Sequence, residues 1–448
     1  MMTWAEAAAA AGGRLAAGAP GAPLGPLSTD SRTAGGGAVF VALRGPKFDA
    51  HDFLDARLAA ECSGWIVRRG ARLPAARPAQ LLEVDDTQAA LSALAAAWRA
   101  RFTIPVVGVT GSNGKTTVKE MLRAALSARG AVCATAGNFN NEIGLPLSVL
   151  GLRPEHAFAV FELGASRKGD IAHLCAVAKP TAAVLTNIAP AHLEFFGSLE
   201  NVLRTKSELL EALPPGAPAA IGGDDPMLAP LVPGLGARAF TFGTGPANRF
   251  RALSGLPPRL SLDGTEIALP PAFAGSVHRL NAAAAAALAT ALGLSPEEIA
   301  RGLAAYTPAP LRFAERRHPS GARLVIDAYN ANPASMRAGL STFLETSPEP
   351  ARLAVLGDMR ELGPESTRLH AELGAWLARQ PLSGAYLAGV EMRAAAEASR
   401  AERAPFPVEH ADEPGALAAA IRPRLAAGTA AYFKASRALR LEALAESL

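Results

Sequence analysis

Short apolar runs alternate with longer stretches rich in alanine and leucine along most of this chain. Apolar runs of about four to eight residues are typical of buried strands, and longer amphipathic stretches are typical of helices. A chain in which the two kinds of element alternate folds as a parallel sheet covered by helices. The pattern therefore predicts an α/β protein.

The alternation falls into three units, which we place at residues 1–82, 83–310 and 311–448. A length of 448 residues favours this division, because one hydrophobic core rarely serves more than about 300 residues. In the first unit we expect strands at 38–43 and 64–67, a helix near 51–60, and an end at the proline- and arginine-rich stretch 72–78.

The second unit is predicted to begin with a helix over 87–98 that Thr87 caps. Its other expected elements are strands at 104–109, 157–163 and 182–188 and helices at 118–128 and 199–213. The glycine- and proline-rich segment 214–271 predicts short strands and turns at the edge of this domain. The third unit repeats the alternation, with strands expected at 324–327, 353–356 and 430–433.

Composition narrows the class of protein. Hydrophobic residues make up 50% of the chain, but the excess is alanine, and no run of about 18 strongly apolar residues could span a bilayer. The alanines at 7–11 follow Glu6 and no basic segment, so we expect an exposed helix there and not a signal peptide. The net charge of +4 is spread along the chain, without the basic block and interleaved aromatics of a nucleic-acid platform. The three cysteines predict reduced packing residues of a cytoplasmic protein: Cys62, Cys133 and Cys175.

The strongest chemical motif is the stretch 106–117, VVGVTGSNGKTT, which predicts a strand, a glycine-rich turn and the start of a helix. In such a turn the backbone N–H groups face phosphate oxygens, a lysine reaches the β- and γ-phosphates, and a threonine hydroxyl binds Mg²⁺. Lys115 and the threonines after it supply these groups, so we expect a nucleoside triphosphate site. The absence of an Asn-Lys-x-Asp motif favours ATP over GTP.

Polar residues that can bind a metal ion follow two of the predicted strands. Glu162 ends the strand at 157–163, at the sheet edge where open α/β folds bind ligands. His192 follows the strand at 182–188, and a neutral imidazole there can join the shell of a metal. Lys206 lies in the next helix, and its residue type alone predicts a surface lysine.

Together these motifs resemble the Mur ligase superfamily, the ATP-dependent amide-forming enzymes that build the peptidoglycan stem peptide. Further stretches are similar to the branch of that superfamily that uses D-alanyl-D-alanine: residues 29–32, 39–45, 48–53, 137–146 and 327–333. The matching segments run in order from about Ser28 to Arg437, so the resemblance covers nearly the whole chain.

The resemblance implies a UDP-binding N-terminal domain, a central ATPase with a P-loop sheet and a Rossmann-like C-terminal ligase domain. It implies that UDP-N-acetylmuramoyl-tripeptide and D-alanyl-D-alanine are joined through an acyl phosphate, giving ADP and the UDP-linked pentapeptide. ATP and two Mg²⁺ ions are then required. We expect a cytoplasmic monomer without nucleic-acid or membrane partners.

The resemblance also implies roles for individual residues. Lys115, His192 and Lys206 are the expected catalytic groups, and Lys206 is expected to be carbamylated by CO₂. The metal ligands implied are Thr116, Glu162, His192 and Lys206. The ATP-binding residues implied are Thr110, Gly111, Ser112, Asn113, Gly114, Lys115, Thr116, Thr117, Asn281, Arg312, Asp327 and Tyr329. The substrate-binding residues implied are Ser31, Arg32, Asp49, His51, Asn138, Asn141, Asn330 and Asn332.

Two other functions remain open at this point. A sister ligase of the same superfamily would add a single amino acid, either at the third stem position or in folate polyglutamylation. A nucleotide-gated switch or motor would use the same glycine-rich turn without ligase chemistry. The third residue of the tripeptide, diaminopimelate or lysine, is left undetermined.

Overall fold

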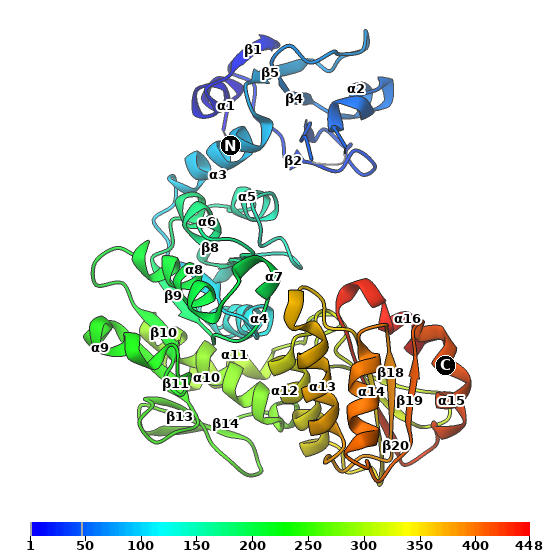
Figure 1. Ribbon diagram of the computed structural model, residues 1–448. Coiled ribbons are helices and arrows are strands. Elements are labelled where there is room, and N and C mark those ends of the chain that lie inside the picture. Colours follow the sequence, from blue (N-terminus) through cyan, green and yellow to red (C-terminus); the bar gives the residue numbers. More distant parts are fainter. Residues whose placement is uncertain (1, 46–47) are drawn as a thin grey trace.

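The computed structural model describes residues 2–45 and 48–448. It contains three sheets, of five, nine and six strands, formed one after another along the chain. Figure 1 shows the first sheet at one end of the molecule, the nine-stranded sheet in the middle and the six-stranded sheet beside it. The α/β prediction is confirmed. The predicted domain boundaries stay predictions. The first falls inside strand β5 (Gln80–Val84), and the second falls between helix α11 (Pro296–Ala304) and strand β15 (Ala314–Arg317).

The first sheet has the strand order β1-β5-β4-β3-β2. Two of its strands lie where we predicted them, β3 (Val39–Val41) and β4 (Gly64–Arg68). Helix α2 (Ala56–Glu61) lies between these strands in the sequence. The remaining elements are α1 (Trp4–Ala11), β1 (Arg14–Ala17) and β2 (Leu27–Ser28). The prediction that α1 is exposed is wrong on one face of the helix, where Trp4 and Ala7 are buried in the core of the first domain. The indole of Trp4 covers the glycine that begins β4.

Helix α3 (Thr87–Arg99) leads from the first sheet into the central domain. Its cap is Asp86 and not Thr87 as predicted: the Asp86 carboxylate accepts hydrogen bonds from the N–H groups of Gln88 and Ala89 at 2.8 and 2.9 Å. Thr87 already lies within the helix, and its hydroxyl donates to the carbonyl of Ala42 at 2.8 Å. A carboxylate next to the helix N-terminus also interacts favourably with the helix dipole.

The central sheet has the order β14-β13-β12-β11-β10-β9-β6-β8-β7. Its strands are β6 (Val106–Thr110), β7 (Ala131–Ala134), β8 (His156–Glu162), β9 (Ala182–Leu185), β10 (Ala219–Gly222), β11 (Ala239–Gly243), β12 (Phe250–Ala252), β13 (Arg259–Leu262) and β14 (Thr265–Ala268). Strands β10 to β14 extend the sheet outward from β9, as the segment 214–271 predicted. The pairs β12–β13 and β13–β14 are antiparallel.

Helices cover both faces of this sheet. They are α4 (Lys115–Leu126), α5 (Gly144–Leu150), α6 (Asp170–Ala178), α7 (Leu193–Phe196), α8 (Leu199–Glu211), α9 (Val232–Leu235), α10 (Ser276–Ala291) and α11 (Pro296–Ala304). The pattern analysis did not predict α10, which is buried in the core through a run of fully buried alanines. Among the described residues, no helix combines the length and the apolar character that a membrane span requires.

The C-terminal sheet has the order β15-β16-β20-β17-β18-β19. Its strands are β15 (Ala314–Arg317), β16 (Arg323–Ile326), β17 (Ala351–Gly357), β18 (Gly384–Ala388), β19 (Val408–Ala411) and β20 (Thr429–Lys434). All pairs are parallel except β15–β16. The helices are α12 (Pro333–Glu345), α13 (Ser366–Leu377), α14 (Met392–Ala401), α15 (Ala418–Ile421) and α16 (Leu441–Ser447). The three predicted strands, β16, β17 and β20, are confirmed, and the structure places them next to one another in this sheet.

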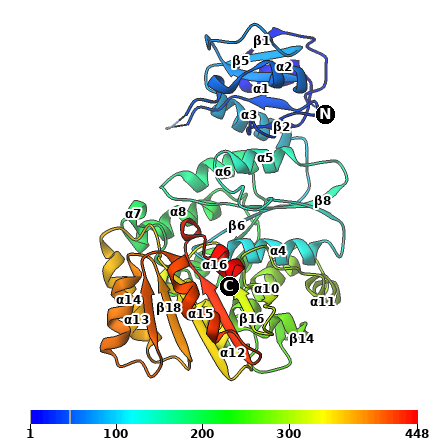
Figure 2. The same ribbon diagram turned by 90° about the vertical axis from the view of Figure 1, so that its right-hand side faces the viewer.

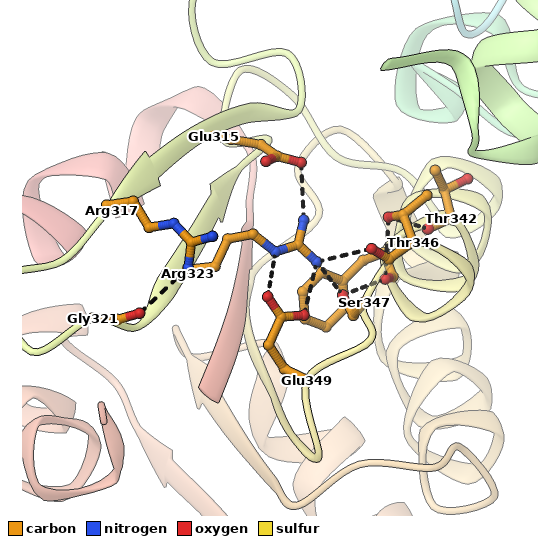
Figure 3. A network of polar contacts seen from close by, with 9 residues as sticks. Glu315, Arg317, Gly321, Arg323, Thr342, Thr346, Ser347 and Glu349 are labelled. Atoms are coloured by element: carbon orange, nitrogen blue, oxygen red, sulfur yellow. Dashed lines mark hydrogen bonds and ion pairs between the residues drawn. The ribbon is translucent and has the colours of Figure 1, made fainter. Parts of the chain in front are cut away.

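A buried arginine fixes one end of this domain (Figure 3). Arg323, at the start of β16, donates to the carboxylates of Glu349 and Glu315, each at 2.9 Å, and to the Ser347 hydroxyl at 2.7 Å. These partners come from β15 and from the loop after α12, so the guanidinium ties both to the sheet. Because β16 and α12 run in opposite directions, the other end of the pair carries Asp327 and Asn332, which we predicted as site residues.

Candidate active site

The glycine-rich turn joins β6 to α4, and the helix begins at Lys115, three residues earlier than predicted. Gly114 stands at the helix N-cap with φ +81°, a left-handed conformation that glycine adopts without steric cost. No side chain caps the helix, so the first N–H groups of α4 stay available to an anion. The turn therefore has the geometry of a phosphate-binding site.

The loop after β9 holds this turn in place. The N–H of Ser112 donates to the carbonyl of Asn187 at 2.9 Å, and the N–H of Asn113 donates to the Asn187 side chain at 3.0 Å. The hydroxyl of Thr186 donates to the carbonyl of Asn113 at 2.6 Å. The same loop continues to His192, so the phosphate-binding turn and the predicted metal ligand His192 share one support.

Lys115 lies over the turn, and its Nζ donates to the carbonyls of Gly111 and Ser112 at 2.8 and 3.3 Å. Burial lowers the pKa of Lys115, the charge of Glu162 opposes that shift, and the Arg312 guanidinium adds to it. Glu162 and Arg312 are thus both close enough to interact with the lysine charge. Phosphate oxygens would stabilise the protonated lysine in the same place.

Glu162 ends β8 and is 2% exposed. One oxygen, Oε1, accepts a hydrogen bond from Asn140 Nδ2 at 2.7 Å. The other, Oε2, is buried and has no hydrogen-bond partner among the described residues. A buried, unpaired carboxylate oxygen is costly unless a cation lies beside it, so this atom suits a metal ion. Asn140 was not among the predicted site residues, although it lies in the motif that supplied two of them.

Lys206 is buried at 2% exposure, so the prediction of a surface lysine from residue type is wrong. Burial holds the pKa of Lys206 well below its ordinary value, and the nearby charge of Lys115 lowers it further. The pKa of His192 is also lowered, first by burial, and both lysines contribute to that shift. The structure therefore brings Lys115, His192 and Lys206 together, on the same side as Glu162.

The described residues contain no group of three or more His, Cys, Asp or Glu side chains arranged for a metal ion. Ligands at this site would have to include other kinds of group. The Thr116 hydroxyl, phosphate oxygens and a carbamylated Lys206 are oxygen donors, which Mg²⁺ prefers. Together with the unpaired oxygen of Glu162, this donor set fits magnesium.

A cavity of about 140 Å³ lies between the central and C-terminal domains. The glycine-rich turn and α10 form one wall, where a methyl group on Gly114 would come within 2.7 Å of Asn281 Oδ1. Predicted residues that line the cavity are Ser112, Asn113, Gly114, Lys115, Thr116, Thr117, Asn281, Arg312, Asp327, Asn330 and Asn332. The phosphate-binding turn and Asp327, far apart in sequence, thus face the same space.

The C-terminal wall contains a lysine that the sequence analysis missed. Lys434, at the end of β20, donates from Nζ to Asp327 Oδ2 at 2.7 Å and to the Asn330 carbonyl at 3.0 Å. Asp327 Oδ2 also accepts from the Tyr432 hydroxyl at 2.9 Å. These two donors fix the orientation of the carboxylate. The sequence did contain one indication of this role: Lys434 follows an apolar run at the end of a predicted parallel strand, and ligands bind at that edge of the sheet in this fold.

Two further residues connect the walls of the cavity. Arg312 donates to the Thr116 hydroxyl at 3.4 Å, and its guanidinium carbon lies 4.1 Å from the ring centre of Tyr329. Asn332 donates from Nδ2 to Asn113 Oδ1 at 2.7 Å, across the domain boundary. Both contacts join the start of α4 to the C-terminal domain.

The predicted substrate residues of the first domain lie outside this cavity. Both ring nitrogens of His51 form hydrogen bonds: Nδ1 with Asp49 Oδ1 at 2.5 Å, and Nε2 with the backbone N–H of Arg68, which donates at 2.9 Å. Arg32 pairs with Asp30 at 2.7 Å, next to Ser31. Asn138 and Asn141 lie in the loop before α5, outside the cavity lining, and Asn141 Oδ1 accepts from the N–H of Gly144 at 2.9 Å. Their substrate roles stay predictions.

Comparison with known proteins gives consistent results. The Mur ligase middle domain family matches residues 109–289, and the family described as Mur ligase, glutamate ligase domain, matches residues 311–437. A UDP-N-acetylmuramoyl-tripeptide–D-alanyl-D-alanine ligase from Synechocystis is 36% identical over 94% of this chain and 91% of its own.

Solved structures agree in fold. The MurF crystal structure from Acinetobacter baumannii has a TM-score of 0.87 at 32% identity and covers 100% of this chain and 98% of its own. The MurF ligase from Thermotoga maritima in complex with ADP has a TM-score of 0.81 at 31% identity, over 94% and 96% of the two chains. The chain belongs to the Mur ligase family, and within it to the UDP-N-acetylmuramoyl-tripeptide–D-alanyl-D-alanine ligases.

Proposed function

We propose that this protein joins D-alanyl-D-alanine to UDP-N-acetylmuramoyl-tripeptide, using ATP and releasing ADP and phosphate. The observation that carries the proposal is the cavity whose walls are the phosphate-binding turn and the Asp327–Lys434 pair. The nearly full-length similarity to ligases named for this reaction supports it.

ATP would bind across both walls of the cavity. The N–H groups of the turn and the Lys115 ammonium would neutralise the β- and γ-phosphates. Asn281, beside the turn, would hydrogen-bond the adenine, and Asp327 the ribose. Arg312 already contacts Thr116 and would reach the phosphates from the C-terminal side.

Magnesium would supply positive charge between the phosphates and the attacking carboxylate. The residues that would hold it are Thr116 and Glu162 for one ion, and His192 and Lys206 for the second. A lysine can serve in this way once its neutral amine adds to CO₂. In that step a bond forms between Nζ and the CO₂ carbon, one proton leaves the nitrogen, and an anionic carbamate remains.

The reaction has two steps. A carboxylate oxygen of the tripeptide attacks the γ-phosphorus, the bond from that phosphorus to the β–γ bridging oxygen breaks, and ADP leaves. The amine of D-alanyl-D-alanine then attacks the acyl carbon, the C–N bond forms, and phosphate and a proton leave. Water would hydrolyse the acyl phosphate, so a cavity enclosed by two domains would protect this intermediate by excluding water.

The decisive experiment supplies ATP, Mg²⁺ and UDP-N-acetylmuramoyl-tripeptide, in its lysine and diaminopimelate forms, with either D-alanyl-D-alanine or single amino acids. Phosphate release and the mass of the product are measured. We expect product with the dipeptide and, in the same assay, none with Lys115→Ala. Product formation with a single amino acid alone would identify a sister ligase. ATP hydrolysis without any amide product would favour the nucleotide-gated switch.

A further inference from the structure

One carboxylate of the C-terminal domain reaches the predicted metal ligand of the central domain. Glu361 lies in the loop after β17, and its Oε2 is hydrogen-bonded to Nδ1 of His192. A carboxylate oxygen accepts, so the imidazole carries its proton on Nδ1. Nε2 of His192 has no protein partner among the hydrogen bonds of the described residues.

Both partners of this contact have unusual backbone conformations. His192 has φ +54° and Glu361 has φ +64°, the left-handed region in which residues other than glycine are uncommon. Each such residue carries backbone strain, and these conformations concentrate at functional sites. Two of them meeting in one hydrogen bond indicate that the side chains are needed where they are.

Neighbouring contacts dock the same two segments. The N–H of Glu194 donates to the carbonyl of Glu361 at 3.2 Å. Leu193 packs against the hydrophobic core of the C-terminal domain. A methyl group on Gly363 would lie 3.3 Å from the Cα of Glu194. Figures 1 and 2 both show α7, which begins at Leu193, against the edge of the C-terminal domain.

We propose that Glu361 is a positioning residue that holds His192 in the tautomer whose Nε2 is free to bind the second metal ion. The C-terminal domain would then complete the second metal site only when it is docked on the central domain. Histidines that bind metals usually donate their other ring N–H to a carboxylate or carbonyl, which fixes the ring and its tautomer. This inference rests on the proposed function, because the second ion belongs to it.

Mn²⁺ binding to the full chain in the presence of ADP tests the inference without turnover. Electron paramagnetic resonance counts free Mn²⁺, and His192→Ala identifies the class of sites that needs the histidine. We expect Glu361→Ala to weaken Mn²⁺ binding at that class of sites about tenfold, the effect typical of losing the hydrogen-bond partner of a metal ligand. Glu361→Gln should stay within about threefold of the wild type, because its amide oxygen still accepts from Nδ1.

Glu365→Ala is the matched control, since it removes a carboxylate four positions along that pairs only with Arg368 in the described structure. It should bind Mn²⁺ as the wild type does. Unchanged or tighter Mn²⁺ binding by Glu361→Ala would overturn the inference; tighter binding would mean that Glu361 competes with the ion. A wild type that takes up only one Mn²⁺ would overturn the two-metal site itself, and the inference with it.

Discussion

Lys206 has a buried amine, and the charge of another lysine, Lys115, acts on it. Burial and like charge both favour the neutral amine, so the pKa of Lys206 is held well below its usual value. A neutral amine is the form that adds CO₂. Under the proposed function, Lys206 would bind a metal ion as the carbamate, whose negative charge replaces the positive charge that a lysine carries in water.

We predict that Lys206→Ala lowers turnover on the order of 100-fold, comparable to the removal of one charge-stabilising group in other active sites. Phosphate release with both substrates measures this. Lys206→Arg keeps a cation that cannot form a carbamate, and it should be equally impaired. In the wild type, labelling with ¹³C-bicarbonate should give a carbamate carbon resonance that both variants lack. Turnover near that of the wild type in Lys206→Ala would refute the assignment.

The second prediction at this scale concerns Gly114. A methyl group there would stand 2.7 Å from Asn281 Oδ1, and the φ of +81° adds strain of about 1 kcal/mol for alanine. We expect Gly114→Ala to weaken ATP binding about tenfold or more, because Asn281 must move. Calorimetric titration with ATP measures the effect.

Gly169 gives a matched control for that substitution. It caps α6 with φ +89°, and no atom lies within 4 Å of the place where its methyl group would be. Gly169→Ala should therefore lose similar stability and bind ATP normally. Equal loss of ATP affinity in the two variants would mean that backbone strain, and not the contact with Asn281, is responsible.

At the scale of elements, Asn332 performs two tasks at the start of α12. Its Oδ1 accepts from the N–H of Ser335 at 2.9 Å and caps the helix, while its Nδ2 donates to Asn113. Asn332→Ala removes both, and Asn332→Asp keeps the cap alone. We predict that the free energy of unfolding of the alanine variant is about 1 kcal/mol lower than that of the wild type. The free energy of unfolding of the aspartate variant should be close to that of the wild type.

ATP affinity should respond differently, because it depends on the contact with the central domain. Both variants should bind ATP more weakly than the wild type, and aspartate the more so, since it places a negative charge beside Asn113. Denaturant unfolding and calorimetry together separate the two tasks. If aspartate bound ATP normally, the contact between Asn332 and Asn113 would have no part in nucleotide binding.

Elements with strong local patterns were the ones that the sequence predicted. Strands β6, β8, β16, β17 and β20 are buried apolar runs, and each lies within a few residues of its predicted position. Strand β1 was not predicted, because it is short and mostly exposed and so has no buried apolar run. Helix α10 was not predicted because alanines surround most of its axis and are buried on nearly every side. The sequence therefore has no alternation of apolar and polar faces that would indicate a helix.

At the scale of the whole molecule, Leu193 is an apolar contact between the central domain and the C-terminal core. We predict that Leu193→Ala increases the radius of gyration measured by small-angle X-ray scattering with ADP present, because the loss of buried area weakens docking. Phe195→Ala, in the same short helix but 47% exposed, should not. An unchanged radius for both variants would show that the polar contacts suffice.

The parts of the site that sequence reasoning missed also belong to this scale. Glu361 and Lys434 acquire their roles only when distant segments meet, at His192 in one case and at Asp327 in the other. The glycine-rich turn is recognisable from local sequence because its chemistry lies within a dozen residues. Contacts between domains leave no such spacing in the sequence. The resemblance supplied Asn281 and Asp327, which local patterns did not predict, but it supplied neither Glu361 nor Lys434.

The nucleotide cavity has one wall in each of two domains, and this has a consequence for inhibition. A small molecule that fills only the glycine-rich turn leaves the C-terminal domain free to swing away. A molecule that binds the turn and the Asp327–Lys434 pair at the same time would link the two domains and hold them in one relative arrangement. Compounds of the second kind should dissociate slowly, because their escape requires the whole molecule to open.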